Sequence, residues 1–251
     1  MARRNTALMI YSMSYILMKD SSIASSDIRS FFKRWPRFYF FIATVFGPVL
    51  FVGLGSEAFL KKYPTSGRIL NLGSGPRILK HPNVTNVDIH PYKGVSIVAD
   101  IKSVPLEGGS ASRIISDNVL EHVPDPQKAV AEMHRLLEKD GLAYIATPFL
   151  YPYHSSPYDY QRWTKQGLIE LFRDFDVVEI GVRSGPFSAL EVYLCHLLGV
   201  LFSFGSVRLN SLITNAAMFV LFPIKLLDFV FSYVPQADTM ASVLYCVVRK
   251  K

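Results

Sequence analysis

The stretch Arg68-Ile-Leu-Asn-Leu-Gly-Ser-Gly-Pro76 decides the fold of this chain. An apolar run, Ile69–Leu72, ends directly in the glycine turn Gly73-Ser74-Gly75, which is typical of a buried parallel strand that enters a tight loop. Glycines are needed in such a loop because the backbone turns sharply and a ligand must approach its N–H groups closely. The stretch therefore predicts an α/β sheet with a ligand at the end of this strand.

An acidic residue, Asp88, lies near the end of the next apolar run, Val84–Ile89. A glycine turn after the first strand and a carboxylate after the second bind a nucleoside in doubly wound α/β folds, where the carboxylate accepts from ribose hydroxyls. Arg77 and Ile78 replace the third glycine of a dinucleotide site, which disfavours a nicotinamide-dependent reductase. An ordinary strand-to-loop turn is the alternative to a binding site.

Two later segments add ordered motifs to this pattern: Asn118-Val-Leu-Glu-His-Val-Pro-Asp-Pro126, continuing to Leu137, and Gly141-Leu-Ala-Tyr-Ile-Ala-Thr-Pro148. With the glycine turn, they resemble the class I S-adenosylmethionine-dependent methyltransferases, in particular the type 11 group. The resemblance covers residues 68–183. It implies a doubly wound, mostly parallel seven-stranded sheet, the Rossmann-like methyltransferase fold, with S-adenosyl-L-methionine bound at the carboxyl ends of the strands.

The resemblance also implies a set of cofactor-binding residues. By position these are Asn71, Gly73, Ser74, Gly75, Asp88, Asp100, Ile101 and Asn118. Asp88 would hold the ribose hydroxyls, Asp100 and Ile101 would flank the adenine, and Asn118 would lie near the substrate with His122. Asn71 stands where the family usually has an acidic residue, which weakens the expected grip on the cofactor's ammonium group. Only a dozen residues separate Gly75 from Asp88, so the first crossover helix must be very short or absent.

Apolar runs and capping residues predict the elements of the sheet independently of this resemblance. Buried strands are expected at 69–72, 84–89, 95–99, 113–116, 142–146, 175–182 and 242–249. One helix should begin at its N-cap Asp125 and end at Gly141, with Ala129, Val130, Met133, Leu136 and Leu137 as its apolar face. A second should follow the N-cap Thr164, with Leu168, Ile169, Leu171 and Phe172 inward.

The loop Pro152–Thr164 is dense in groups that bind polar ligands. It follows the fifth strand, and loops at the carboxyl ends of strands are where sites form. His154 and His122 are the candidate catalytic residues, since His154 could take a proton from a hydroxyl nucleophile. The candidate substrate contacts are Tyr153, Asp159 and Arg162. The structural alternative pairs Asp159 with Arg162, packs Trp163 on the sheet, uses Thr164 as a cap and gives His122 a hydrogen bond in a turn.

The first 62 residues are basic, with nine Lys or Arg against three Asp or Glu, and so carry most of the net charge of +7. The remaining chain is close to neutral, which argues against a nucleic-acid partner. A basic cluster, Arg29, Lys33, Arg34 and Arg37, abuts the apolar run Phe38–Ser56, as suits an anionic membrane surface. Gly47-Pro48 breaks this run, which favours an interfacial helical hairpin over a spanning helix or a buried helix. A signal peptide over Met1–Met18 is a further alternative.

A second apolar block lies between the last two predicted strands, at residues 186–238. The corresponding connection is short in the resembled fold, so we interpret the block as a helical insertion. Its polar residues recur at helical spacing: Ser188, Glu191, Cys195, Gly199 and Ser203. The insertion fits helices that lie in the plane of a membrane surface, or a helical subdomain that covers the active site and buries its own core.

The sequence thus predicts four segments: a basic, apolar extension (1–62), a methyltransferase core (63–185), the apolar insertion (186–238) and the last strand (239–251). The expected function is methyl transfer to a small or lipid-linked acceptor by a protein peripheral or monotopic on the cytoplasmic face of a membrane. Cys195 and Cys246 form no metal or disulfide pattern, so we expect no metal site and a reducing compartment. The alternative is a non-catalytic, membrane-associated relative that uses the fold for binding.

Overall fold

The computed structural model describes residues 45–76, 78–154 and 158–251. The possible signal peptide at Met1–Met18 and the basic cluster Arg29, Lys33, Arg34 and Arg37 lie outside the described residues, as does the first part of the apolar run Phe38–Ser56. The predictions made for these segments therefore stay predictions.

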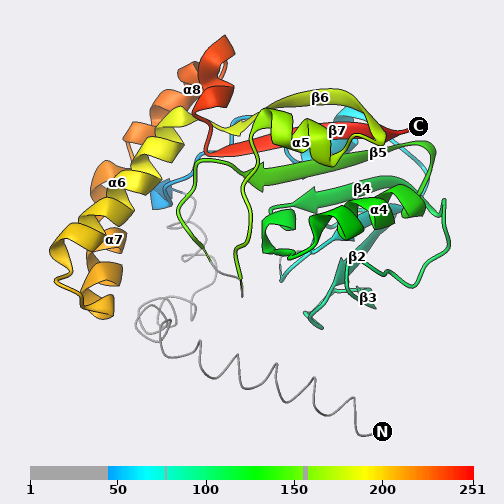
Figure 1. The fold of residues 1–251 in the computed structure, drawn as a ribbon, viewed down its shortest axis with the longest axis horizontal. Helices are drawn as coiled ribbons and strands as arrows, with labels where there is room; N and C mark the ends of the chain where they lie inside the picture. The colour runs from blue at the N-terminus through cyan, green and yellow to red at the C-terminus, as the bar shows by residue number, and fades with distance from the viewer. Residues whose placement is uncertain (1–44, 77, 155–157) are drawn as a thin grey trace, which may run out of the picture. The chain divides into compact units, whose positions relative to one another are not determined.

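The core is a seven-stranded sheet with the order β3-β2-β1-β4-β5-β7-β6 (Figure 1). Its strands are β1 (Ile69–Leu72), β2 (Val84–Asp88), β3 (Ile97–Val98), β4 (Ala111–Asp117), β5 (Leu137–Pro148), β6 (Phe175–Ser184) and β7 (Val243–Lys250). The pairings from β3 to β5 are parallel, and β7 runs antiparallel to both β5 and β6. The predicted doubly wound, mostly parallel α/β sheet is confirmed, and every expected strand is present.

Alternate residues of the strands face two separate apolar cores, which is why the strands read as continuous apolar runs in the sequence. Leu70 and Leu72 of β1 lie in the core under the helices α4 (Pro126–Leu136) and α5 (Lys165–Leu171). Ile69 lies in the opposite core, under α3 (Ser56–Lys62). Figure 1 shows α4 and α5 on the same face of the sheet.

Side-chain caps start the two helices where the sequence predicted. Asp125 accepts a hydrogen bond from the backbone N–H of Lys128, and Pro126 is the first residue of α4. Thr164 accepts from the N–H of Gly167 at the start of α5. The turn from Gly73 to Val84 is short, and its described residues contain no helix between β1 and β2, as the spacing required.

Two details of the predicted helices are wrong. The helix expected to reach Gly141 ends at Leu136, because Leu137 already pairs with Ala111 of β4 and starts β5. Asp140, at φ +60°, lies within β5, where the register of β5 with β4 shifts between Leu137 and Leu142. Ile169 was expected inward but is 42% exposed, because the short α5 buries only Leu168 and the following Phe172.

Helices occupy the whole connection between β6 and β7: α6 (Pro186–Phe202), α7 (Val207–Leu221), η2 (Ile224–Leu227), α8 (Asp228–Phe231) and η3 (Pro235–Thr239). The described residues divide into two compact units, one of which contains residues 45–48 and 191–224. Within this unit the Phe46 ring packs on the rings of Phe219 and Phe222, at centroid distances of 4.8 and 4.9 Å. The other unit, residues 49–190 and 225–251, contains the sheet.

Asp228 closes the first turn of α6 inside the unit that contains the sheet. Its fully buried carboxylate accepts hydrogen bonds of 2.9 Å from the backbone N–H groups of Phe187 and Ser188. A helix leaves its first N–H groups without intrahelical partners and presents the positive end of its dipole there. Asp228 therefore supplies both the acceptors and the charge that this helix end needs.

We predict that Asp228→Ala lowers the free energy of unfolding by about 1.5–3 kcal/mol, because it removes two charge-assisted hydrogen bonds from a buried helix end. Urea unfolding followed by circular dichroism measures the change. Asp176→Ala is the matched control, since that carboxylate lies on the surface and 3.9 Å from Lys251; it should leave stability nearly unchanged. Equal effects of the two substitutions would contradict the capping role.

Candidate functional site

The glycine turn after β1 needs glycine on steric grounds. Gly73 and Gly75 have φ angles of +70° and +59°, which side chains disfavour. A Cβ at Gly73 would lie 2.5 Å from the Val119 side chain, whereas a Cβ at Gly75 would meet open space. The N–H groups of Gly73 and Ser74 both donate to the Val87 carbonyl, at 2.9 and 3.1 Å. The turn is therefore fixed on its sheet side and open beside Gly75.

Asp88 joins this turn to the end of β2. One carboxylate oxygen accepts from the N–H of Gly75 and the other from the N–H of His90, each at 2.8 Å. Asp88 is buried, and each oxygen retains lone-pair capacity beyond these bonds. The structure thus brings the predicted cofactor residues Gly73, Ser74, Gly75 and Asp88 together at one edge of the sheet.

The remaining predicted cofactor residues have different surroundings. Asn71 is buried, and its side-chain amide donates to Asn86 at 2.8 Å, between β1 and β2. Asp100 follows β3 and accepts from the N–H of Lys102, while Ile101 is buried in the core. Asn118 follows β4 in the left-handed region, at φ +55°, and its backbone N–H donates to Ala146. Asn118 therefore lies at the carboxyl end of β4, and Asp100 at that of β3.

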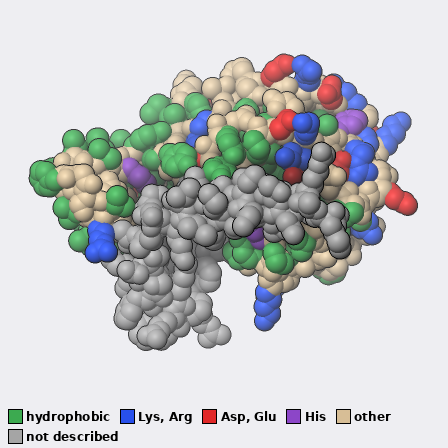
Figure 2. Space-filling model, turned by 60° about the horizontal axis from the view of Figure 1, so that its bottom comes forward, with side chains coloured by type: hydrophobic (Ala, Val, Ile, Leu, Met, Phe, Trp, Pro, Cys, Tyr) green, Lys and Arg blue, Asp and Glu red, His purple; other side chains and the backbone are tan. Residues whose placement is uncertain are grey.

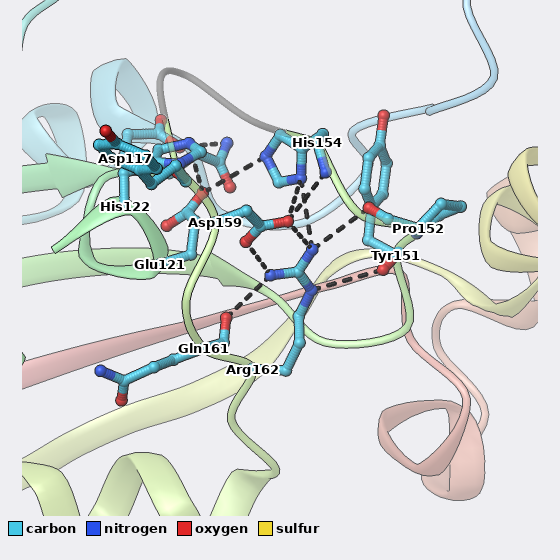
Figure 3. A network of polar contacts seen from close by, with 11 residues as sticks. Asp117, Glu121, His122, Tyr151, Pro152, His154, Asp159, Gln161 and Arg162 are labelled. Atoms are coloured by element: carbon cyan, nitrogen blue, oxygen red, sulfur yellow. Dashed lines mark hydrogen bonds and ion pairs between the residues drawn. The ribbon is translucent and has the colours of Figure 1, made fainter. Parts of the chain in front are cut away.

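A group of three residues, Glu121, His122 and His154, forms a polar centre that we call the Glu121 cluster (Figure 3). Glu121 and His122 belong to the short helix η1 (Leu120–His122) after β4, and His154 belongs to the loop after β5. The Nε2 atoms of His122 and His154 lie 3.7 and 3.9 Å from the same carboxylate oxygen of Glu121. Glu121 is fully buried, and neither of its carboxylate oxygens has a hydrogen-bond partner among the described residues.

The Nδ1 atoms of the two imidazoles face other groups. His122 Nδ1 lies 2.6 Å from the carbonyl oxygen of Tyr158, which can only accept, so this nitrogen carries the proton. His154 Nδ1 lies 3.4 Å from a carboxylate oxygen of Asp159 and 3.4 Å from Nη2 of Arg162. Nε2 of each ring therefore faces Glu121. The ring bond of His122 joins it to the distant loop, so it is not the turn hydrogen bond of the structural alternative.

Arg162 holds the loop that carries His154. Its guanidinium pairs with Asp159 and donates to the carbonyls of Tyr151, Pro152 and Gln161. Asp159 also accepts from the backbone N–H of His154 at 2.8 Å. The sequence left open whether these residues contact a substrate or have structural roles. The observed contacts are those of the structural roles: Asp159 pairs with Arg162, Trp163 is buried in the core, and Thr164 caps α5. Tyr153, the third candidate for substrate contact, lies at the surface with 66% exposure.

Burial dominates the electrostatics of the Glu121 cluster. It raises the pKa of Glu121 to about 8, because the carboxylate loses water and gains little in exchange. Burial also lowers the pKa of His154, which favours the neutral imidazole. At Asp159 burial acts to raise the pKa, but the hydrogen bonds from Arg162 and from the His154 N–H outweigh it, and the pKa lies below its usual value.

Sequence reasoning did not single out Glu121. It stands in the Leu-Glu-His-Val stretch that carried the family resemblance, and it was treated there as part of a motif. The residues next to Glu121 in the chain do not predict that its side chain is buried. Its burial depends on the loop after β5, which is distant in the sequence and packs over η1. The backbone bond from Tyr160 N–H to the Glu121 carbonyl is that contact.

Comparison with known proteins identifies the domain. Residues 51–145 match a family described as the methyltransferase domain, of the type 11 group, so the resemblance expected from the sequence is confirmed. An uncharacterized 37.1 kDa protein in transposon TN4556 of Streptomyces fradiae is 32% identical over 88 residues, which are 35% of this chain and 25% of that protein. The match thus spans about a quarter of the curated relative.

Two solved structures that align with this chain are methyltransferases. The 1,6-didemethyltoxoflavin-N1-methyltransferase of Burkholderia thailandensis aligns with a TM-score of 0.50 at 15% identity, over 95% of this chain and 90% of that chain. The phosphoethanolamine N-methyltransferase 2 of Haemonchus contortus aligns with a TM-score of 0.45 at 16% identity, over 77% of this chain and 51% of that chain. The first of these supports the methyltransferase fold.

We predict that Arg162→Ala lowers the free energy of unfolding by about 1.5–3 kcal/mol, because the buried Asp159 carboxylate loses its charged partner. Arg173→Ala is the matched control, since Arg173 also pairs with the acid three residues before it, Glu170, but both side chains are exposed. Chemical unfolding of the two variants should show a clear loss for the first and little for the second. Similar losses would mean that the Arg162 network does not hold the loop.

Proposed function

Because residues 51–145 match the methyltransferase domain of the type 11 group, we propose that the chain is an S-adenosylmethionine-dependent enzyme that methylates a small or lipid-linked acceptor at a membrane surface. The observation that carries the proposal is the pairing of the glycine turn with Asp88. Both follow parallel strands and lie at their carboxyl ends, where open α/β sheets bind ligands.

The residues around the glycine turn fit S-adenosylmethionine. Gly75 leaves open space where a side chain would otherwise fill the cradle, and the buried Ser74 hydroxyl has no hydrogen-bond partner among the described residues. The Asp88 carboxylate has lone pairs left for ribose hydroxyls. Ile89, which follows it, is an exposed apolar side chain suited to contact with a base. When bound, the cofactor supplies an electrophilic methyl group on a sulfonium.

The Glu121 cluster is the proposed acceptor side of the site. It follows β4 and β5, so it lies at the same edge of the parallel strands as the glycine turn after β1. Methyl transfer is an in-line displacement, and the protein mainly has to align the acceptor and exclude water. His122 and His154 are the groups that contact the acceptor. Arg162 is a positioning residue, because its guanidinium is engaged by Asp159 and by backbone carbonyls of the loop.

Exposed apolar side chains support the membrane part of the proposal. In the unit of residues 191–224, Val200 on α6 and Val220 on α7 are 66% and 74% exposed, and Phe204 between these helices is 89% exposed. Figure 2 shows hydrophobic side chains at the surface over α6 and α7. Large exposed apolar patches mark interaction sites, and the basic residues that precede Phe38 suit anionic lipid.

The described residues contain no single helix that is both long and apolar enough to cross a membrane. The segments Val207–Leu221 and Ile224–Phe231, separated by a short break, reach the required length and composition as a pair. An interfacial position on the cytoplasmic face, peripheral or monotopic, is the arrangement that we propose.

We predict that Asp88→Ala weakens S-adenosylmethionine binding by about tenfold or more, because it removes charge-assisted hydrogen bonds worth about 1.5–3 kcal/mol. Titration calorimetry of the purified protein measures the change, with thermal unfolding as the test of folding. Asp88→Asn keeps an acceptor for one backbone N–H but removes the charge, so its affinity should lie between those of the native protein and Asp88→Ala. A folded Asp88→Ala variant with unchanged affinity would remove Asp88 from the site.

We predict that Val200→Glu combined with Val220→Glu weakens binding to anionic phospholipid vesicles by roughly tenfold or more, because two apolar side chains no longer leave water. Vesicle co-sedimentation at several salt concentrations measures it, since salt screens the basic contribution but not the apolar one. Ile169→Glu on α5 is the control, an exposed apolar residue outside the patch. A native protein that ignores vesicles at low salt would overturn the membrane proposal.

A further inference from the structure

The Glu121 carboxylate is an unusual group in this protein. It is completely buried, and both oxygens lack hydrogen-bond partners among the described residues. Two other carboxylates with buried side chains are satisfied: Asp228 accepts from two backbone N–H groups, and Asp159 pairs with Arg162. Burying a carboxylate without partners is costly, so a native structure that keeps one there calls for an occupant.

The surroundings of Glu121 are those of a metal ligand set. Zinc-type ions are bound by imidazole nitrogen and carboxylate oxygen, and a ligating histidine usually donates its other ring N–H to a carbonyl or carboxylate. His122 has this arrangement through the Tyr158 carbonyl. His154 Nδ1 lies 3.4 Å from the Asp159 carboxylate and 3.4 Å from Nη2 of Arg162, so Asp159 is the group that can accept its N–H. In both rings Nε2 remains toward Glu121 (Figure 3).

We propose that Glu121, His122 and His154 form a binding site for one divalent transition-metal ion of the Zn²⁺ class. One ligand atom from each residue lies within 4.8 Å of the other two. Ligand atoms at about 2.0–2.1 Å from a tetrahedral ion lie about 3.3–3.4 Å apart. The separations of 3.7 and 3.9 Å between Glu121 and the two imidazoles therefore need to shorten by only a few tenths of an ångström.

Two nitrogens and one oxygen favour Zn²⁺ or a similar first-row ion over Mg²⁺, which prefers oxygen ligands. Three protein ligands leave at least one coordination position open, as in catalytic rather than structural zinc sites. This part rests on the proposed function: the open position would hold an acceptor oxygen and lower its pKa, in place of direct proton removal by His154. The sequence pointed to His122 and His154 but not to a metal site, because the ligands come from η1 and from the loop after β5, which are distant in the chain.

The test uses the full chain, freed of metal by a chelator and titrated with Zn²⁺ in a calorimeter. We expect saturation at one equivalent, a rise in thermal unfolding temperature with Zn²⁺, and little response to Mg²⁺. Glu121→Gln keeps the shape of the side chain, and His154→Gln lies on a loop; each should weaken Zn²⁺ binding by roughly a hundredfold or more. Asp159→Asn removes the negative charge that faces His154 Nδ1 and pairs with Arg162, and should weaken Zn²⁺ binding by about 10–100-fold.

His134→Gln is the control, since that imidazole lies on α4 against the Phe175 ring and should leave Zn²⁺ affinity unchanged. The proposal is overturned if the native chain does not bind Zn²⁺. It is also overturned if the folded Glu121→Gln and His154→Gln variants bind Zn²⁺ as tightly as the native chain does. S-adenosylmethionine is titrated into the same samples. Cofactor binding without Zn²⁺ binding rejects the metal site alone, whereas loss of cofactor binding by the native chain rejects the proposed function.

Discussion

The close approach of the first glycine turn to the end of β4 is the constraint on which the candidate site depends. Gly73 lies where a Cβ would come within 2.5 Å of Val119, and it has a φ angle that side chains disfavour. Val119 is followed directly by η1, the helix that carries Glu121 and His122. Because Gly73 has no side chain, the glycine turn can pack against Val119, directly before η1. The turn is expected to hold the cofactor, and η1 is expected to face the acceptor.

Two segments complete the site, the loop after β5 and the helix η1 after β4, and each contains a buried carboxylate. One carboxylate has a charged partner and the other does not. The loop after β5 is held by a satisfied pair, because Arg162 neutralises Asp159 and also bonds the backbone on both sides of His154. The segment after β4 carries Glu121, which is buried without hydrogen-bond partners among the described residues. A satisfied pair fixes geometry, whereas an unsatisfied group between oriented imidazoles is prepared for a ligand. Asp159, which is paired, therefore keeps the loop rigid, whereas Glu121, which accepts no hydrogen bond from the described residues, is the group suited to bind a ligand.

The parts of the structure that local chemistry decides could be predicted from the sequence. Glycine at a left-handed turn, Asp125 and Thr164 as caps, and Asp88 after the second strand depend on residues close to them in the chain. The end of α4 could not be predicted, because Leu137 leaves the helix to pair with Ala111 of another strand. The burial of Glu121 was invisible for the same reason, since the segment around Tyr160 covers it from a distant position in the sequence.

The proposed metal site at the Glu121 cluster and the proposed membrane surface would together restrict the chemistry of the acceptor. A metal ion at the cluster would favour an oxygen acceptor, because a Lewis acid lowers the pKa of a bound hydroxyl. An amine has a different requirement, since it must lose its proton to a base before it can attack. The apolar side chains exposed on α6 and α7 favour an acceptor that reaches the site from a lipid surface. A hydroxyl on a lipid-linked molecule would fit both the proposed metal site and the proposed membrane surface, whereas a free amine in solution would fit neither.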